Sequence, residues 1–260
     1  MQPSLAELRQ QPHTSISAIK SFLQCPRKYR LQYLDRVRPA FRSAALVLGS
    51  AWHDTIDEWL LADHAEPEAL RAHLRDGLVR RLRDADVLFD DDDEDEDNLV
   101  DMSLRMLDAF VATVPKPERT LGVEVSFALE LTCPTTGEVL PVRLIGSVDA
   151  LIVENGVETL WELKTSRRRW SADQLEFDMQ PSAYQMAARS LGYDPELTLL
   201  VTTKWARPVV QVERLVRHGR DERELIETIF SVHRAAEAGV DHTMRGWQCR
   251  TCAWAGACAP

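Results

Sequence analysis

Four of the five cysteines in this 260-residue chain stand near its two ends. Cys25 lies close to the N-terminus, and Cys249, Cys252 and Cys258 follow one another near the C-terminus. Thiolates in such a group are typical of a Zn²⁺ or iron–sulfur site, and the spacing alone does not choose between the two. A shared site would tie residue 25 to residue 249, so the fold must bring the ends of the chain together.

The composition excludes several classes of protein. The N-terminal residues lack the apolar stretch of a secretory signal, and no apolar run approaches the length of a membrane span. No Gly-x-x-x-x-Gly-Lys-Ser/Thr phosphate loop is present, so the sequence contains no ATPase motor of that kind. We therefore expect a cytoplasmic protein without a membrane partner, whose cysteines bind metal or react rather than form disulfides.

The formal net charge of −10 comes from one segment. Ten acidic residues and no Lys or Arg lie between Asp84 and Asp97, and the rest of the chain is balanced at 31 acidic and 31 basic residues. A run of this kind cannot be buried, so we expect residues 84–98 to form a mobile, solvated loop. The alternative is a decoy for DNA phosphates that gates a basic groove.

Apolar periodicity predicts a single mixed α/β domain over residues 1–260. Residues 15–115 are expected to be helical, residues 120–217 to form a sheet core, and residues 220–260 to form a helix and the cysteine tail. The expected helices are 17–24 (capped by Ser17), 27–34, one that opens at Gly49, 68–83, 99–114, 173–191 and 221–238, and the expected strands are 123–131, 142–152, 157–165, 197–203 and 209–216.

Two of these strands carry a candidate active site. Glu162 and Lys164 are two residues apart and therefore project from the same face of their strand. The turn Glu154-Asn155-Gly156 is a strong hairpin signal, and it lays Asp149 on the neighbouring strand beside them.

Facing carboxylates repel one another unless a positive charge lies between them. Oxygen ligands suit Mg²⁺ or Mn²⁺, and Lys164 can orient water or stabilise charge that develops on a phosphate. The residues alone leave an ordinary cross-strand salt bridge as an equal alternative.

The pattern Asp149…Glu162-Leu-Lys164 resembles the signature of the PD-(D/E)XK nuclease superfamily. The chain is most similar to the RecB-like exonuclease branch with an iron–sulfur cluster, which includes the AddB nuclease domain and CRISPR-associated RecB-type exonucleases. Further segments match that branch: Ser15 to Tyr29 around Cys25, Leu48-Gly-Ser-Ala-Trp-His53, and Gln180-x-x-x-Tyr184.

The resemblance implies a restriction-endonuclease-like sheet and a role for each matching residue. The implied metal ligands are His53, Asp149, Glu162 and the Leu163 carbonyl, the implied catalytic residues are Asp149, Glu162, Lys164, Gln180 and Tyr184, and the implied [4Fe–4S] ligands are Cys25, Cys249, Cys252 and Cys258, with zinc as the alternative. Gln180 and Tyr184 share one helix face and are expected to contact the DNA backbone or to brace Lys164. Pro181 places the start of their helix near Gln180.

A basic and aromatic cluster follows the catalytic strand. Arg167, Arg168, Arg169 and Trp170 suit single-stranded DNA, because arginines bind phosphates and a base stacks on tryptophan. A second, weaker cluster is Lys204-Trp205-Ala-Arg207. An exposed loop that only balances charge is the alternative for both.

These observations predict a Mg²⁺- or Mn²⁺-dependent exonuclease that degrades single-stranded DNA. Expected settings are DNA repair, recombination or CRISPR adaptation, in partnership with a separate helicase or adaptation proteins. The first rival is a non-catalytic DNA-binding subunit, and the intact Asp, Glu and Lys set argues against it. The second is a zinc or redox protein in which the cysteines are the function.

The cysteine site predicts how the chain behaves without its metal. Closing so long a loop stabilises a domain by roughly 5 kcal/mol in the loop-entropy model. We expect Cys252→Ser to loosen both termini, measured as faster digestion by protease than the parent. Cys133→Ala is the matched control, because Cys133 stands in a predicted turn away from the other four. A Cys252→Ser variant as resistant as the parent would contradict the prediction.

Overall fold

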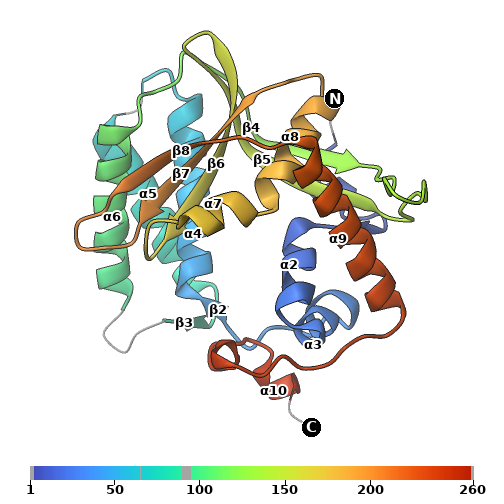
Figure 1. The fold of residues 1–260 in the computed structure, drawn as a ribbon. Helices are drawn as coiled ribbons and strands as arrows, with labels where there is room; N and C mark the ends of the chain where they lie inside the picture. The colour runs from blue at the N-terminus through green and yellow to red at the C-terminus, as the bar shows by residue number, and fades with distance from the viewer. Residues whose placement is uncertain (1–2, 65, 90–94, 259–260) are drawn as a thin grey trace.

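The computed structural model of the chain describes residues 3–64, 66–89 and 95–258. A six-stranded mixed sheet lies between two groups of helices (Figure 1). The strands are β1 (His13–Thr14), β4 (Arg119–Leu129), β5 (Arg143–Glu154), β6 (Val157–Ser166), β7 (Glu196–Thr203) and β8 (Val210–Leu215). Their order is β1-β5-β6-β7-β8, with β4 paired to the other edge of β5. The expected α/β class with a mixed sheet is therefore confirmed.

Each face of the sheet packs against its own helices. One face covers a core with α4 (Ala44–Leu61), α5 (Pro67–Arg83) and α6 (Glu96–Thr113), and the other with α2 (Ile16–Gln24), α8 (Gln180–Ser190) and α9 (Gly219–Glu237). Trp161 and Leu163 of β6 point into the first core, whereas Leu160 points into the second. This alternation places Glu162 and Lys164 on the α2 and α8 side of the sheet.

The predicted hairpin is present and sets the register of β5 against β6. Asn155 and Gly156 both have positive φ, 52° and 74°, as a two-residue hairpin turn requires. The strands pair antiparallel from Glu154↔Val157 to Ala150↔Trp161. β7 then runs parallel to β6, because α7 (Ala172–Phe177) and α8 return the chain to the end of the sheet at which β6 begins.

Several predicted helix boundaries were wrong. The first long helix, α2, is capped by Ser15, whose side chain accepts the Ala18 N–H, and not by Ser17. The helix expected to open at Gly49 begins at Ala44 and is capped by Ser43, because Ala44, Val47 and Leu48 continue its buried face. The single helix expected over 173–191 is divided into α7 and α8, with Pro181 in the first turn of α8.

Part of the segment predicted to be a mobile loop, residues 84–98, forms regular secondary structure instead. Val87–Leu88 form β3, which pairs with β2 (Arg42–Ser43), and α6 begins at Glu96 with Asp95 as its cap. Residues 90–94, the centre of the predicted mobile loop, lie outside the described residues. None of the helices in the described ranges is long and apolar enough to cross a membrane.

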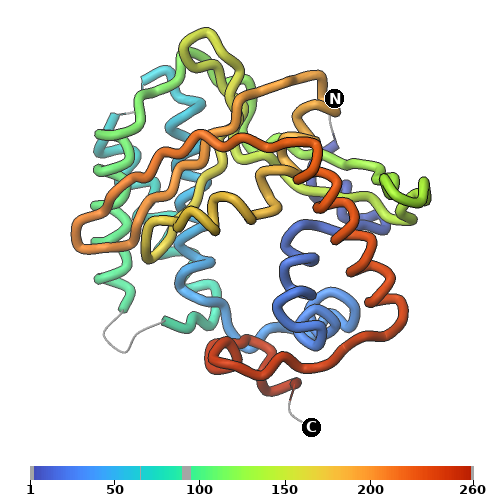
Figure 2. Tube along the Cα trace, viewed as in Figure 1, coloured from blue at the N-terminus to red at the C-terminus, as the bar shows by residue number. Residues whose placement is uncertain are grey.

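The C-terminal tail packs against the segment that follows Cys25, on the side of the molecule away from the N-terminus (Figure 1). The tail, with short helical turns Trp247–Cys249 and α10 (Ala255–Cys258), lies against α3 (Pro26–Tyr29) and the segment after it (Figures 1 and 2). The Arg27 N–H donates to the His242 carbonyl at 3.1 Å, and the Ala40 N–H to the Ala253 carbonyl at 2.9 Å. Trp254 Nε1 donates to the Val37 carbonyl at 2.8 Å.

Candidate active site

The site forms where β5 diverges from β6. Their backbone pairing stops at Ala150↔Trp161, and the next residue of β5, Asp149, uses its side chain instead. Asp149 Oδ2 accepts the Leu163 N–H at 2.7 Å. The carboxyl is buried, and this burial raises its pKa from 3.8 to about 6, although Lys164 and the Leu163 N–H act in the opposite direction.

Glu162 is fully buried and lies beside Lys164. The two side chains form an ion pair, and no other donor among the described residues bonds either Glu162 oxygen. Burial raises the pKa of Glu162 to about 7, against the lowering effect of Lys164. Burial would lower the pKa of Lys164, but Glu162 and Asp149 outweigh it and raise that pKa. Partly unsatisfied buried oxygens of this kind are suited to a bound cation.

Glu124 places a third carboxylate near Asp149, and the sequence alone did not identify it. His53 of α4, Glu124 of β4 and Asp149 each place a ligand atom within 4.8 Å of the other two, the one such group in the described ranges. His53 Nδ1 lies 3.8 Å from both Glu124 Oε1 and Asp149 Oδ1. Burial and Lys164 lower the pKa of His53, so its imidazole is neutral at pH 7 and able to bind a metal.

Glu124 reaches the site through an irregular backbone. The register pairs Val123 with Ala150 and Val125 with Val148, so Glu124 stands opposite Asp149. Its φ of 45° is in the left-handed region, which costs a residue other than glycine about 1–3 kcal/mol and is frequent at functional sites. The only sequence signal for Glu124 was that it is an acidic residue at a polar position of a strand in which apolar and polar residues alternate.

Asp57 also faces the group, one turn of α4 after His53. Burial and the neighbouring carboxylates raise its pKa to about 7, and its Oδ1 is buried without a hydrogen-bond partner in the described chain. In the sequence Asp57 looks like any polar residue of a helix. Only the packing of α4 against the sheet shows that it lies near Glu124 and Asp149.

Gln180 is directed at Lys164. Its Oε1 accepts from Lys164 Nζ at 3.3 Å, and its Nε2 donates to the Tyr184 hydroxyl at 2.6 Å. Gln180 therefore contacts Lys164 directly and Tyr184 contacts it through Gln180, while both expectations for this pair, contact with the DNA backbone and bracing of Lys164, stay predictions. Burial raises the pKa of Tyr184 well above its usual value, so the phenol remains protonated.

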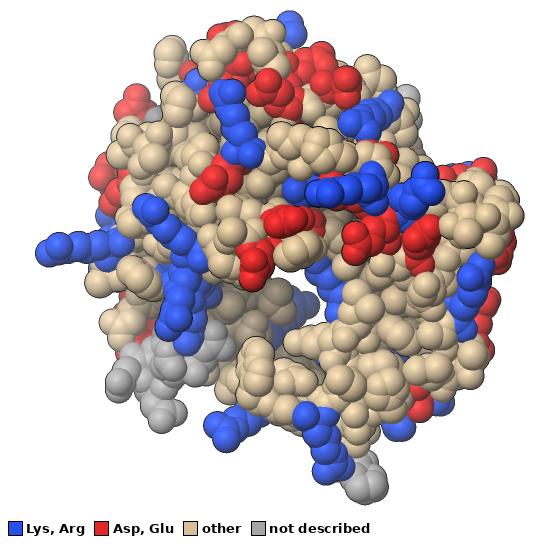
Figure 3. Space-filling model, viewed as in Figure 1, with Lys and Arg blue, Asp and Glu red and all other residues tan. Residues whose placement is uncertain are grey.

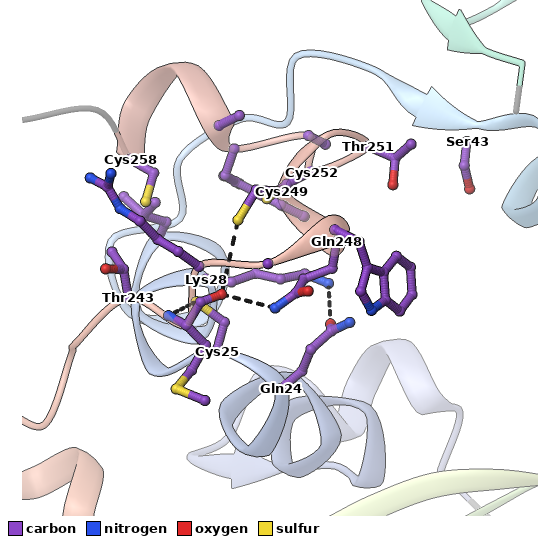
Figure 4. Close-up of a pocket in the computed structure, with 18 of the residues that line it drawn as sticks. Gln24, Cys25, Lys28, Ser43, Thr243, Gln248, Cys249, Thr251, Cys252 and Cys258 are labelled. Carbon is purple, nitrogen blue, oxygen red and sulfur yellow. Dashed lines mark hydrogen bonds between the residues drawn. The ribbon is translucent and has the colours of Figure 1, made fainter.

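The four terminal cysteines line one cavity of about 470 Å³ (Figure 4). Two segments supply them, Cys25 after α2 and the C-terminal tail, and the Met244 backbone lies near a sulfur atom of each. The Met244 N–H lies 3.5 Å from Cys25 Sγ, and its carbonyl lies 3.9 Å from Cys249 Sγ. All four are free thiols, and Cys133 is buried elsewhere, in the α2 and α9 core.

The two predicted DNA-binding clusters lie next to each other. Both follow the carboxyl ends of parallel strands, β6 and β7, and the Lys204 N–H donates to the Ser166 carbonyl at 2.7 Å. The Trp170 backbone N–H donates to Gln211 Oε1, Gln211 Nε2 donates to the Trp170 carbonyl, and Trp205 is 54% exposed. Lys and Arg gather over these loops on the face in Figure 3, which is also hollowed between α2 and α4.

Comparison with known proteins identifies the family. The family model described as PD-(D/E)XK nuclease superfamily matches residues 13–259. No curated protein matches the chain.

Two solved structures are similar over nearly the whole chain. One, a protein from Eubacterium rectale named "Putative exonuclease", is 16% identical, with a TM-score of 0.57 over 96% of this chain and 93% of that chain. Another, SSO0001, is 15% identical, with a TM-score of 0.43 over 95% of this chain and 86% of that chain. The first similarity shows a shared fold.

The raised carboxyl pKa values predict how stability depends on pH. Because the folded protein holds the Glu162 proton more tightly than the unfolded chain does, its stability falls as pH rises from about 4.5 to about 7. Relative to the parent, Glu162→Gln should therefore gain about 1–3 kcal/mol across this window in metal-free buffer. Urea unfolding at each pH tests this, with the exposed Glu130→Gln as control. Parallel curves for Glu162→Gln and the parent would contradict it.

Proposed function

Because the chain belongs to the PD-(D/E)XK nuclease superfamily, we propose that it is a metal-dependent nuclease that hydrolyses phosphodiester bonds in DNA. The observation that carries the proposal is the pair of buried carboxyls, Asp149 and Glu162, beside Lys164 on two adjoining strands, with His53 and Glu124 next to Asp149. A scaffold or cysteine-based redox protein would not require carboxyls whose pKa values burial has raised in this way.

The residues present fit a divalent cation. Hard carboxylate oxygens and one neutral imidazole suit Mn²⁺ or Mg²⁺, and a bound cation would supply Lewis-acid chemistry and an activated water. His53, Asp149 and Glu162 would hold it together with the Leu163 carbonyl, and Glu124 is a further candidate ligand. The Lys164 ammonium would stabilise negative charge that develops on the phosphate, while Gln180 keeps it in place.

We further propose that the four cysteines hold a [4Fe–4S] cluster. The four thiols come from two segments distant in the sequence and line one cavity of about 470 Å³, which supports a shared thiolate-bound group. Iron and sulfide analysis of anaerobically purified protein tests this assignment, and stoichiometric zinc would overturn it.

The substrate we propose is single-stranded DNA, trimmed from an end. Arg167, Arg168, Arg169 and Trp170 begin three residues after Lys164, and Trp205 offers an exposed ring beside them. Arginines on phosphates and bases on aromatic rings give binding with little sequence preference. A separate helicase or CRISPR adaptation proteins would supply the ends.

The first prediction concerns the lysine. With Mg²⁺ or Mn²⁺, the parent should degrade end-labelled single-stranded DNA, and Lys164→Ala should lose about 100-fold or more in kcat, because it removes transition-state stabilisation. Lys116→Ala is the matched control. Lys116 is also a lysine, but its ammonium binds the backbone carbonyls of Ala62 and Asp63 and none of the proposed site residues. Equal cleavage by Lys164→Ala and the parent would mean that the nuclease activity does not depend on this site. If the parent binds DNA but does not cleave it, the alternative of a non-catalytic DNA-binding subunit is favoured.

A second prediction concerns the loops after β6 and β7. Arg169→Ala should weaken DNA binding and reduce the slope of log K against log salt by about 0.7, because one phosphate contact is lost. Trp205→Ala should weaken binding by about 1–3 kcal/mol without changing that slope, because stacking is insensitive to salt. Fluorescence anisotropy over a salt series separates the two effects. Unchanged affinity in both variants would mean that the loops do not contact DNA.

A further inference from the structure

The side-chain oxygen of Gln180 lies between two ammonium groups. Lys164 Nζ is 3.3 Å from Gln180 Oε1, and Lys20 Nζ, from α2, is 3.5 Å from the same atom. Two like charges on one acceptor repel each other, so each needs a carboxylate nearby. Glu162 pairs with Lys164, and Asp178 pairs with Lys20.

Asp178 fixes both the lysine and the start of α8. Both of its carboxylate oxygens lie 2.8 Å from Lys20 Nζ, and Oδ1 also accepts the Gln180 N–H at 2.7 Å. The Asp178 side chain is 15% exposed and that of Lys20 is 38% exposed, so the carboxylate is shielded from solvent while the ammonium remains partly accessible. The backbone and side chain of Gln180 are therefore held by neighbouring groups.

This arrangement allows only one orientation of the Gln180 amide. The carbonyl oxygen faces two cations, and the amide nitrogen donates to the buried Tyr184 hydroxyl at 2.6 Å. Rotating the amide by half a turn would place its N–H groups against two ammoniums. Removing Lys20 would take away one of these cations and free Asp178, which weakens that preference.

We propose that Lys20 and Asp178 are positioning residues that hold the Gln180 amide against Lys164. Neither residue needs to touch the DNA or the metal. Their effect reaches the reaction through Gln180, which orients the lysine that stabilises the phosphate. This inference rests on the proposed nuclease function.

The test begins with steady-state cleavage of single-stranded DNA by Lys20→Met. We expect kcat to fall about 10- to 100-fold, as misplacement of a catalytic group does, with KM changed less than about twofold. Lys20→Arg should recover most of the loss, because it keeps the charge next to Asp178. Lys116→Met is the matched control and should behave like the parent. A Lys20→Met enzyme with the parent's kcat would overturn the proposal.

A double-mutant cycle tests whether Lys20 acts through Gln180. In a Gln180→Leu background, adding Lys20→Met should cause no further loss of kcat, since the shared acceptor is already gone. Independent, multiplicative losses would overturn the proposal. A thermal unfolding curve for each variant accompanies the cycle, and a Tm near that of the parent shows that the losses do not come from unfolding.

A second measurement does not depend on cleavage. The side-chain amide resonances of Gln180, assigned by their loss in Gln180→Leu, should shift in Lys20→Met and Asp178→Asn and remain unchanged in Lys116→Met. Unchanged resonances in Lys20→Met would overturn the positioning role even in an active enzyme. If the parent cleaves no DNA but these resonances shift as expected, the nuclease function fails while the Lys20–Asp178–Gln180 contact stands.

Discussion

Two buried carboxyl groups lie beside a partly buried lysine on β5 and β6, and the surrounding structure must compensate for them. An ionised group that leaves water without a partner costs several kcal/mol. Asp149 receives a backbone N–H, Glu162 receives only the Lys164 ammonium, and Lys164 in turn needs Gln180. The compensation is incomplete at the Glu162 oxygens and at Asp57, and both residues face the region where a divalent cation would complete it.

The divergence of strands makes room for this arrangement. In the described chain β5 pairs with β1 only at residues 143–144 and with β6 only at residues 150–154, so residues 145–149 have no strand on that edge. A continuous ladder would have bonded the Leu163 N–H to backbone and filled the space with a neighbouring strand. The gap instead lets His53 approach from α4 and Gln180 from α8.

The same elements connect the site to the cysteines. α2 carries Lys20 and ends at Cys25, about 7.5 Å further along the helix axis. Its buried residues Ile16, Ile19 and Phe22 pack in one core with Ala183 and Tyr184 of α8. The helix α2 thus carries Lys20, which contacts Gln180 of α8, and ends at Cys25, which lines the cysteine cavity.

Local pattern determined much of this protein without its tertiary structure. Alternating apolar residues and the Asn155-Gly156 turn predicted the strands and their register, because strand periodicity and turn geometry depend on neighbouring residues. They placed Asp149 beside Glu162 and Lys164. Only the tertiary structure decided that Glu124 of β4, Asp57 of α4 and Lys20 of α2 belong with them, since no short-range pattern encodes a contact such as that between Lys20 and Asp178, 158 positions apart.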